Sequence, residues 1–563
     1  MLWRWTRHFI CHTLWLTAAS HSALASREDF HEDLVLRLLP DGRVSSKFTF
    51  TTLLRDATPR NPESLTLEDD SQHYTLFPLA LGQVLREYAI TEMHLNLNAG
   101  KWNYDRWGYP DEPGVGTGAE LWAWMGDGGP ATFVAPNIVV STQGPLNFRV
   151  DHRWQGLRNA LAGLFCASLG SLDDLRTTSP TVAFEPEGIL PNWPQPHQLR
   201  HASLPSEHVC TENLTPFLKL LPCKSLSGVA SLLNPHRLFD ADWHGMGVHV
   251  SFDELDGVRV RLTFQTVFDP VRGSSQNRRD WSFASLFDRK VEQACPVAST
   301  SVVRIALPED QTYLLTPGYV FEDGYALFDM SNSSQAFHVA MEWPNEPKFS
   351  YPPNYNNVSP VPLSVQRTLR GPSQARGELS VVVTNHESVE IQTVYLETMP
   401  WLLQFYLHTL RVTHNGEPRN DLISNISYSP PLPHARPTTL QCIITVPPRS
   451  TIYLTIDVSK SFLRYTEHPP DAQRGWDLPP AVFVPVKPEQ DNEHASLGAS
   501  RYQRIYTPTL LADLATPDFS MPYNVIILSC TLITLIFGTI FNVLTRKFVV
   551  VHLDQPREAA KTQ

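Results

Sequence analysis

VIILSCTLITLIFGTIFNVL, residues Val525–Leu544, is the stretch that decides the architecture of this chain. No residue between Phe519 and Thr545 carries a charge at neutral pH. About 20 residues at 1.5 Å each form a helix of roughly 30 Å, which matches the hydrocarbon core of a bilayer. A helix buried in a soluble core would be shorter and would show one polar face, whereas the polar residues here are small or lie near an end. The sequence therefore predicts a transmembrane helix over residues 524–545.

The beginning of the chain predicts a cleaved signal peptide. Arg4 and Arg7 precede an apolar run over residues 9–19, which is too short to span a bilayer. The segment Ala23–Ala25 then supplies the small side chains that a signal peptidase accepts. The mature chain is expected to follow a signal peptide of residues 1–25.

The basic residues after the apolar stretch predict its orientation. Arg546 and Lys547 follow it at once, and basic residues mark the cytosolic end of a span. Residues 546–563 are therefore predicted to be a cytosolic tail, which makes the topology type I. A GPI attachment signal also ends in a hydrophobic stretch, but such a signal stops there, whereas this chain continues with basic residues.

The composition favours a protein rich in strands. The formal charge is −12, and no run of more than two basic residues occurs, which argues against a nucleic-acid surface. The 14 Trp and 27 Phe residues are ample for large cores, and the 47 prolines favour strands and long loops over a helical bundle. We predict a chain that is mainly β with some α.

The first part of the chain has the pattern of an α+β domain. Alternating apolar residues over 34–39 and 44–50 flank a turn and predict a hairpin. Apolar residues at helical spacing over 151–169 predict a helix that covers the sheet. Trp122 and Trp124 are interpreted as core residues rather than as a platform for a sugar.

The second part predicts a β-sandwich. Asn415-Gly416 between two strands is the strongest local hairpin signal. Short strands without helices between them favour a sandwich, and they are expected over residues 378–384, 390–396, 405–414, 439–446 and 451–458. The predicted division is a signal peptide over 1–25, a lumenal α+β domain over 26–299, a β-sandwich-like domain over 300–486, a juxtamembrane connection over 487–523, the transmembrane helix over 524–545 and the tail over 546–563.

The cysteines predict one thiol without an intrachain partner. Cys11 leaves with the signal peptide and Cys530 lies in the bilayer, which leaves five cysteines in an oxidising compartment. Cys442 alternates with apolar residues on a strand, and Cys166 lies in the amphipathic helix, so both are interpreted as buried free thiols. Of the remaining three, Cys210, Cys223 and Cys295, at most two can pair with each other. An unpaired cysteine in a loop is a candidate for a bridge to another chain.

Catalytic motifs are missing from the sequence. It has no C-x-x-C, H-E-x-x-H, G-x-S-x-G or phosphate-binding glycine loop. The nearest approach to a metal cluster matches no zinc spacing, and it consists of His236, Asp240, Asp242, His244 and His249. We therefore predict no catalytic, metal or cofactor site, and a binding or scaffolding subunit rather than an enzyme. A lumenal glycosidase, for which no carboxylate pair can be singled out, and a cell-surface adhesion receptor stay as alternatives.

Six stretches resemble one protein family. They occur in the family's order over the mature chain: YTLFPLALGQ (Tyr74–Gln83), GAELWAW (Gly118–Trp124), GLFCASL (Gly163–Leu169), VCTENLTP (Val209–Pro216), LETMPWLLQFYLHTL (Leu396–Leu410) and TPDFSMPYNVI (Thr516–Ile526). The chain resembles the PIG-T family, whose members are subunits of GPI transamidase.

The resemblance implies a function and partners. It implies a non-catalytic subunit of the endoplasmic-reticulum complex that replaces a C-terminal signal of precursor proteins with a GPI lipid. In that family the nucleophilic cysteine belongs to a separate caspase-like subunit, and the cysteine of VCTENLTP links to that subunit. By resemblance Cys210 forms the interchain disulfide, and Cys223 and Cys295 are left to pair with each other. The other membrane subunits and the GPI lipid are further expected partners.

The entry to the membrane helix carries a second hypothesis. Asp518 and Ser520 precede the span and can cap its first turn, since their oxygens can accept unpaired backbone N–H groups. Alternatively, Asp518, Ser520 and Asn524 lie at headgroup depth and hydrogen-bond the polar part of the GPI lipid. The two interpretations are equally weighted.

Four sequons are candidates for N-glycosylation in a lumenal chain. They begin at Asn213, Asn332, Asn357 and Asn425. Because proline follows the first and third of these triplets, Asn332 and Asn425 are the preferred sites.

Overall fold

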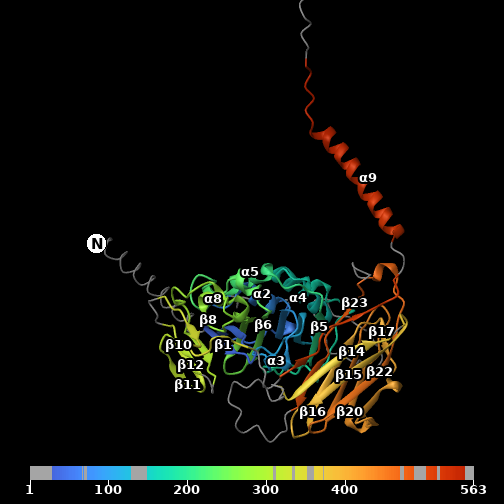
Figure 1. Cartoon of the computed structure of the whole chain (residues 1–563). Coiled ribbons are helices and arrows are strands. Elements are labelled where there is room, and N and C mark those ends of the chain that lie inside the picture. The colour runs from blue at the N-terminus through green and yellow to red at the C-terminus, as the bar shows by residue number, and fades with distance from the viewer. Residues whose placement is uncertain are drawn as a thin grey trace, which may run out of the picture. The chain divides into compact units, whose positions relative to one another are not determined.

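A computed structural model describes most of the chain (Figure 1). The described residues are 28–65, 67–68, 73–128, 149–308, 312–331, 336–350, 361–371, 373–468, 474–486, 503–516 and 520–551, without the side chains of residues 465 and 520–522. They fall into two compact units. The larger unit runs to Phe462 and includes Gly475–Leu514, and the smaller one holds Leu463–Arg474 and the chain from Ala515 on. The predicted signal peptide of residues 1–25 lies outside the described residues.

A ten-stranded sheet forms the first half of the larger unit. Its order is β11-β12-β9-β1-β2-β7-β6-β3-β4-β5. The strands are β1 (Glu28–Leu38), β2 (Val44–Leu54), β3 (Ile90–Ala99), β4 (Gly118–Gly126), β5 (His197–Leu204), β6 (Trp243–Asp253), β7 (Gly257–Phe268), β9 (Thr300–Ala306), β11 (Val320–Glu322) and β12 (Tyr325–Asp329). The predicted hairpin is confirmed, since β1 and β2 pair antiparallel with Leu38 opposite Val44.

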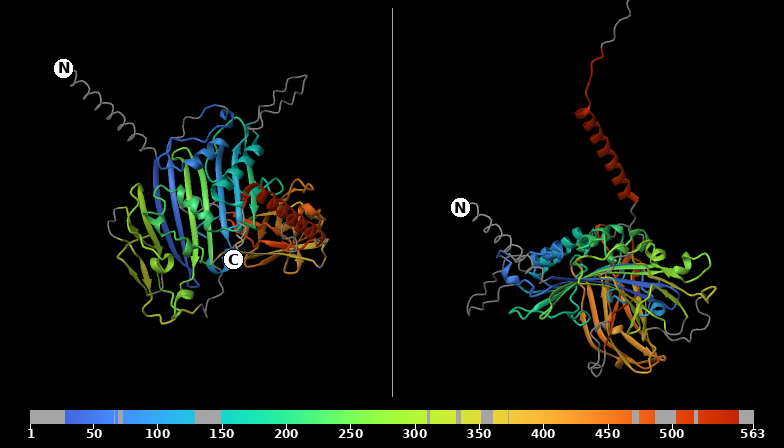
Figure 2. Two further views of the ribbon diagram at one scale, coloured as in Figure 1. Left: turned by 90° about the horizontal axis from the view of Figure 1, so that it is seen from above. Right: turned by 90° about the vertical axis from the view of Figure 1, so that its left-hand side faces the viewer.

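The two faces of this sheet are buried in different ways. Alternate residues such as Met93, Leu95 and Leu97 of β3 join an apolar core. Helices supply the other side of that core, because their apolar residues recur at helical spacing. They are α2 (Leu79–Glu87), α4 (Val150–Phe165) and α5 (Thr211–Leu220), and Figure 2 shows the helices lying over one face of the sheet. The intervening residues of β3, including His94 and Asn96, are also buried, on the opposite face.

Short elements complete the first half. The helices α3 (Tyr104–Trp107), α6 (Pro235–Leu238), α7 (Pro270–Gly273) and α8 (Phe283–Phe287) lie between the strands along the chain. A three-stranded sheet has the order β10-β13-β8, with β10 (Leu314–Thr316), β13 (Ala340–Glu342) and β8 (Trp281–Ser282).

Sheet pairing crosses the boundary predicted near residue 300. β9 runs parallel to β1, with His31 opposite Thr300, and β12 then pairs with β9. Strands after residue 300 therefore complete the first sheet instead of opening the second part. The strands that follow Trp343 belong to other sheets. The division of the chain into domains therefore stays a proposal, with its boundary after Trp343.

Most of the remaining strands of the larger unit form the predicted sandwich-like pair of sheets. One sheet has the order β14-β15-β22-β18-β19 with β17 also on β22, and the other has the order β20-β21-β16-β24-β25. The strands are β14 (Leu363–Arg370), β15 (Arg376–Asn385), β16 (Ile391–Met399), β17 (Leu403–Phe405), β18 (Arg411–His414), β19 (Glu417–Pro418), β20 (Ile423–Ser429), β21 (Thr438–Val446), β22 (Thr451–Lys460), β24 (Val482–Val486) and β25 (Ile505–Tyr506). Asn415 and Gly416 make the expected turn, both with positive φ, between β18 and β19. The expected single strand over 405–414 is instead broken by a turn at Leu407–Thr409.

The segment before the membrane helix is partly folded. β25 pairs with β24, and β26 (Leu510–Ala512) pairs with β23 (Trp476–Leu478). Residues 505–512, predicted to belong to the juxtamembrane connection, therefore add a strand to one sheet and form a separate two-stranded sheet with β23. Residues 487–502 lie outside the described part of the chain.

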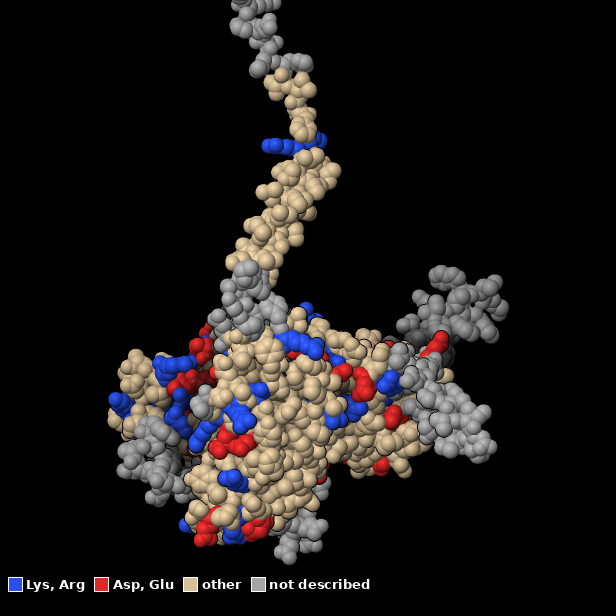
Figure 3. Space-filling view, turned by 90° about the vertical axis from the view of Figure 1, so that its right-hand side faces the viewer, with Lys and Arg blue, Asp and Glu red and all other residues tan. Residues whose placement is uncertain are grey.

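The smaller unit contains one long apolar helix. It is α9 (Ser520–Thr545), and Tyr523–Thr545 is long and apolar enough to cross a membrane. Figure 3 shows it as a column without charged side chains until basic residues appear at its end. These are Arg546 and Lys547 of the predicted cytosolic flank.

Candidate functional site

Cys210 lies where a loop turns into helix α5. It is the N-cap residue, and its backbone N–H donates to Oδ1 of Asn213 at 2.7 Å while the backbone N–H of Asn213 donates to the Cys210 sulfur. This reciprocal pair satisfies N–H groups that a helix start leaves unpaired. The thiol is partly exposed and forms no disulfide within the chain. The site therefore presents a sulfur atom on a backbone that is fixed by its own hydrogen bonds.

Cys166 lies beside this site and not inside the preceding helix. The expected helix up to Leu169 and the expected burial of this thiol are both wrong, because α4 ends at Phe165 and Cys166 takes a left-handed conformation with φ of 53°. Its side chain is exposed. Asn213 Nδ2 donates to the carbonyls of Phe165 at 2.9 Å and Cys166 at 3.3 Å, so one side chain ties the end of α4 to the start of α5.

Cys223 and Cys295 form a disulfide with a Cα–Cα distance of 5.9 Å. They are the two cysteines that the resemblance left over for an intrachain bond. Helix α5 separates Cys210 from Cys223, and its ten residues span about 15 Å. Because disulfides need Cα atoms within about 7 Å, Cys210 and Cys223 cannot pair in this fold.

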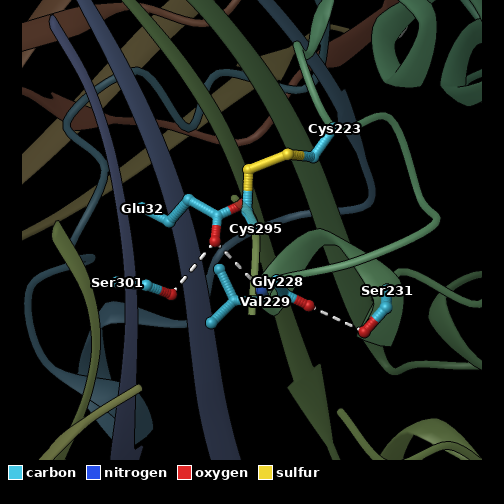
Figure 4. The surroundings of a disulfide bond; sticks show 7 residues. All are labelled: Glu32, Cys223, Gly228, Val229, Ser231, Cys295 and Ser301. Atoms are coloured by element: carbon cyan, nitrogen blue, oxygen red, sulfur yellow. Dashed lines mark hydrogen bonds between the residues drawn. A yellow bond between two sulfur atoms is a disulfide. The ribbon is translucent and has the colours of Figure 1, made fainter. Parts of the chain in front are cut away.

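A buried carboxyl group lies next to the disulfide (Figure 4). Glu32 of β1 accepts hydrogen bonds at Oε2 from Ser301 Oγ at 3.0 Å and from the backbone N–H of Val229 at 3.3 Å. Its Oε1 has no hydrogen-bond partner among the described residues. Burial raises the pKa of Glu32 to about 7, against the smaller opposite effect of its two hydrogen bonds. Gly228 makes this approach possible, since a Cβ there would meet Glu32 Oε2.

Cys442 is a buried free thiol, as its strand alternation predicted. Every second residue of β21 is buried, and Cys442 is 3% exposed. Burial raises the pKa of its thiol to about 12. A neutral, enclosed sulfur of this kind does not react with solutes at neutral pH.

The sheet face opposite the helices holds a row of buried ionisable side chains in contact with one another. His94 Nδ1 lies 2.9 Å from His249 Nδ1, and His249 Nε2 lies 3.1 Å from Glu112. Burial lowers the pKa of His249 to about 4, so this ring is neutral at pH 7. Burial opposes the ionisation of Glu112, but Lys47 at 3.4 Å and Arg261 at 3.6 Å help to hold its pKa well below the usual range.

The segment leading into β25 closes this polar face. The Arg504 guanidinium lies 3.2 Å from Glu187 and stacks over the rings of Trp122 and Phe184, with its side chain 2% exposed. Against the effect of burial, the neighbouring His94 ring and Arg504 guanidinium lower the pKa of Glu187 to about 2. Arg504 therefore ties the end of the larger unit to the ten-stranded sheet.

Tyr506, two residues later, also connects this segment to the ten-stranded sheet. Its hydroxyl donates to Glu120 Oε2 at 2.7 Å, and its backbone N–H donates to the Tyr104 hydroxyl at 3.0 Å. Glu120 also lies 3.0 Å from His201. Trp122 and Trp124 of the same strand are buried, which confirms that they are core residues.

Residues of the cluster that came nearest to a metal-binding pattern make other side-chain contacts in the structure. Asp242 pairs with Arg43 at 2.6 Å and with Arg272 at 3.1 Å, and the His244 ring lies against Phe239. Asp240 lies 3.9 Å from Arg272. Within the described residues, no group of three His, Cys, Asp or Glu side chains is placed to hold a metal ion.

The lipid-contact residues are described only in part. Asp518 lies outside the described residues, and Ser520 begins α9 without a described side chain. Asn524 lies in the first turns of α9 and is exposed.

The sequons differ in their accessibility. Asn332 and Asn357 lie outside the described residues. Asn213 is 1% exposed and uses its side chain between the helices, so it is closed to glycosylation in the folded chain. Asn425 is exposed, with φ of 51°, at an irregular position of β20.

Comparison with known proteins assigns the chain to a family. The family model described as Gpi16 subunit, GPI transamidase component, matches residues 13–279 and 270–563. The chain belongs to the Gpi16 family. The Gpi16-family chain is 34% identical to the human GPI-anchor transamidase component PIGT over 94% of its own length and 92% of that protein. It is 30% identical to the GPI transamidase component GPI16 of Saccharomyces cerevisiae, over 93% and 89% of the two lengths.

The resemblance drawn from the sequence is thereby confirmed for this Gpi16-family chain. Among solved structures, the Corynebacterium diphtheriae pilin SpaA matches 33% of the chain and 51% of its own length at 14% identity. A TM-score of 0.18 is too low to indicate a shared fold or function.

Proposed function

We propose that this chain is a non-catalytic subunit of the endoplasmic-reticulum GPI transamidase, which scaffolds the complex that attaches GPI anchors to proteins. Family membership supports the assignment to the complex. A scaffolding role is supported by the buried charges of the polar sheet face, since Glu112, Glu120 and Glu187 are each held by neighbouring side chains and not left open to a substrate. The observation that carries the proposal is Cys210, an accessible thiol held at the surface of a rigid corner.

Cys210 is the proposed covalent link to the caspase-like catalytic subunit. Substitution Cys210→Ser should remove a band on a non-reducing gel of microsomes that falls to the monomer on reduction. Because serine also caps helices well, the change should leave α5 intact. The matched control is Cys442→Ala, whose enclosed thiol cannot bridge two chains and whose loss should keep the band. Persistence of the linked band in Cys210→Ser would refute the assignment.

The second proposed contact is with the GPI lipid. Asp518, Ser520 and Asn524 would lie at headgroup depth, where a charge-assisted bond from Asp518 to an ammonium group gains strength from partial desolvation. Alanine at each position should reduce GPI attachment to a reporter protein while the complex still co-purifies. Asn542→Ala near the other end of α9 serves as the control. Normal transfer in all three variants would exclude lipid contact and leave helix capping as their role.

An endoplasmic-reticulum location with the bulk of the chain in the lumen is part of the same proposal. Asn332 and Asn425 are the proposed glycan sites, and the exposed position of Asn425 supports one of them. Endoglycosidase H should increase the mobility of the chain, and Asn425→Gln should remove part of that change. Asn213→Gln should leave the number of glycans unaltered, since its side chain is enclosed. Resistant, complex glycans would place the chain at the cell surface, as expected for an adhesion receptor.

A further inference from the structure

Two free thiols, Cys166 and Cys210, belong to backbone segments that the Asn213 side chain joins. Cys166 follows the last residue of α4, and Cys210 precedes the first residue of α5. The carboxamide of Asn213 accepts from the Cys210 backbone N–H at 2.7 Å and donates to the Cys166 carbonyl at 3.3 Å. A single side-chain amide thus spans the gap between the two backbones. Cys166 is exposed and Cys210 is partly exposed.

The other lumenal cysteines are occupied or enclosed. Cys223 and Cys295 are joined to each other, and Cys442 is 3% exposed within the sandwich. Among the described residues of the larger unit, Cys166 and Cys210 are therefore the two thiols that solvent and a disulfide donor can reach. In an oxidising compartment, neighbouring accessible thiols are expected to pair.

A second, independent observation is the unusual backbone conformation of Cys166. Its φ of 53° is the left-handed conformation that commonly ends a helix, where glycine or asparagine is preferred because a Cβ is strained there. Cysteine offers no advantage as a helix end. A strained backbone conformation is typical of positions where the side chain has a function.

We propose that Cys166 and Cys210 form an intrachain disulfide in the unassembled chain, and that a partner's thiol displaces Cys166 from Cys210 when the chains are linked. The second half of this proposal rests on the proposed function of Cys210. The intrachain and interchain bonds exclude each other, because both use the Cys210 sulfur.

The chemistry needs one external oxidant. Oxidised glutathione, or a protein disulfide of the same chemical class, accepts two electrons from the two thiols. Cys210 thiolate first attacks its S–S bond and releases one thiolate, and Cys166 thiolate then attacks the Cys210 sulfur of the mixed disulfide and releases the second. On assembly, the partner's thiolate attacks the Cys210 sulfur, the Cys166–Cys210 bond breaks, and Cys166 leaves as a thiolate that takes a proton from water. This last exchange requires no oxidant.

Closing the pair would involve the residue that follows the last turn of α4. Disulfides need Cα atoms about 4.4–6.8 Å apart. Cys166 lies beyond the last helical residue, so it can shift without disturbing the turns of α4. The Asn213 bond to the Cys166 carbonyl would open, while the bond to the Phe165 carbonyl at 2.9 Å would still hold the two helices together.

The test maps the cysteines of the full-length chain with and without its partners. The chain is expressed alone in microsomes, free thiols are blocked with N-ethylmaleimide, and the unreduced protein is digested with trypsin. Cleavage after Arg158, Arg176, Arg200 and Lys219 separates Cys166 from Cys210 into the peptides 159–176 and 201–219. The expected result is a reducible cross-link between these two peptides, and its replacement by blocked Cys166 in the assembled, Cys210-linked complex.

Variants separate this proposal from the proposed function. In Cys166→Ser expressed alone, Cys210 should become fully reactive with N-ethylmaleimide or carry glutathione, while Cys442→Ala should leave the cross-link unchanged. Full blocking of both Cys166 and Cys210 in the oxidised, unassembled wild-type chain would overturn the intrachain bond, and this readout requires no variant to fold. A cross-link in the lone chain together with an interchain band that survives Cys210→Ser would instead overturn the linkage role of Cys210 and the displacement step.

Discussion

Replacement of Arg504 by alanine is expected to lower the free energy of unfolding of the larger unit by about 3–5 kcal/mol, the usual effect of removing one partner from a buried ion pair. The side chain is 2% exposed, pairs with Glu187 at 3.2 Å and stacks on Trp122 and Phe184. Alanine would leave the Glu187 carboxylate enclosed without its guanidinium partner. The thermal midpoint of the detergent-solubilised chain, followed by tryptophan fluorescence, should fall by about 3–5 °C.

A surface arginine provides the matched control for this experiment. Arg419 also pairs with a carboxylate, Asp421 at 2.8 Å, but both groups are open to solvent. Arg419→Ala should leave the midpoint nearly unchanged, because water screens exposed ion pairs. Arg504→Lys keeps the positive charge but lacks the planar guanidinium group with its paired N–H donors. This variant should have an intermediate thermal midpoint. Equal midpoints for Arg504→Ala and Arg419→Ala would mean that β25 is not held through Arg504.

Loss of the Cys223–Cys295 bond should have the second large effect. The double variant Cys223→Ala/Cys295→Ala is expected to lose about 2–5 kcal/mol of stability, because the bond closes a long loop in the unfolded chain. The closed loop covers a sequence separation of 72 residues. A urea titration followed by tryptophan fluorescence would measure the change as a lower midpoint.

A reductant serves as the control for the disulfide variant. In a Cys210→Ser background, which removes the other accessible sulfur pair, dithiothreitol should lower the midpoint of the chain that keeps Cys223 and Cys295. It should leave the double variant unaffected. If reductant shifted both chains equally, the loss would come from side-chain packing around Cys295 and not from the covalent bond.

Local sequence patterns were sufficient for several elements of this fold. The membrane helix, the β1–β2 hairpin, helix α4 and the Asn415-Gly416 turn were all predicted, since each is determined by residues close together in the chain. Cys442 was predicted as a buried thiol for the same reason, because strand alternation alone sets its direction.

Pairings between distant segments could not be predicted in this way. The parallel contact of β1 with β9 joins residues 31 and 300, and nothing in either segment specifies the other. The pattern change near residue 300 therefore gave no sign that β9 and β12 join the first sheet. Arg504 and Tyr506 were missed because a two-residue strand in a polar stretch has too little pattern, although the apolar and aromatic Ile505-Tyr506 was a weak signal.

The candidate site was predicted in part. The number of cysteines indicated that one lumenal thiol lacks a partner, and the resemblance selected Cys210. Helical periodicity placed Cys166 inside α4, because Ala167 and Leu169 continue the apolar spacing. Gly170 is placed to end a helix at Leu169, and position 166 itself is not a glycine, so the exposed left-handed Cys166 emerged only from the structure.

The parallel pairing of β1 with β9 has a consequence for biosynthesis. His31 and Thr300 share a 2.9 Å hydrogen bond across 269 positions of the sequence. At translation rates of about 5–20 residues per second, the first hairpin waits roughly 15–50 s for its neighbour to be made. During that time its apolar side and a free backbone edge are open to association with other nascent chains. Folding of this polypeptide should therefore depend on a chaperone that shields the early hairpin until the ribosome has passed the codons for β9.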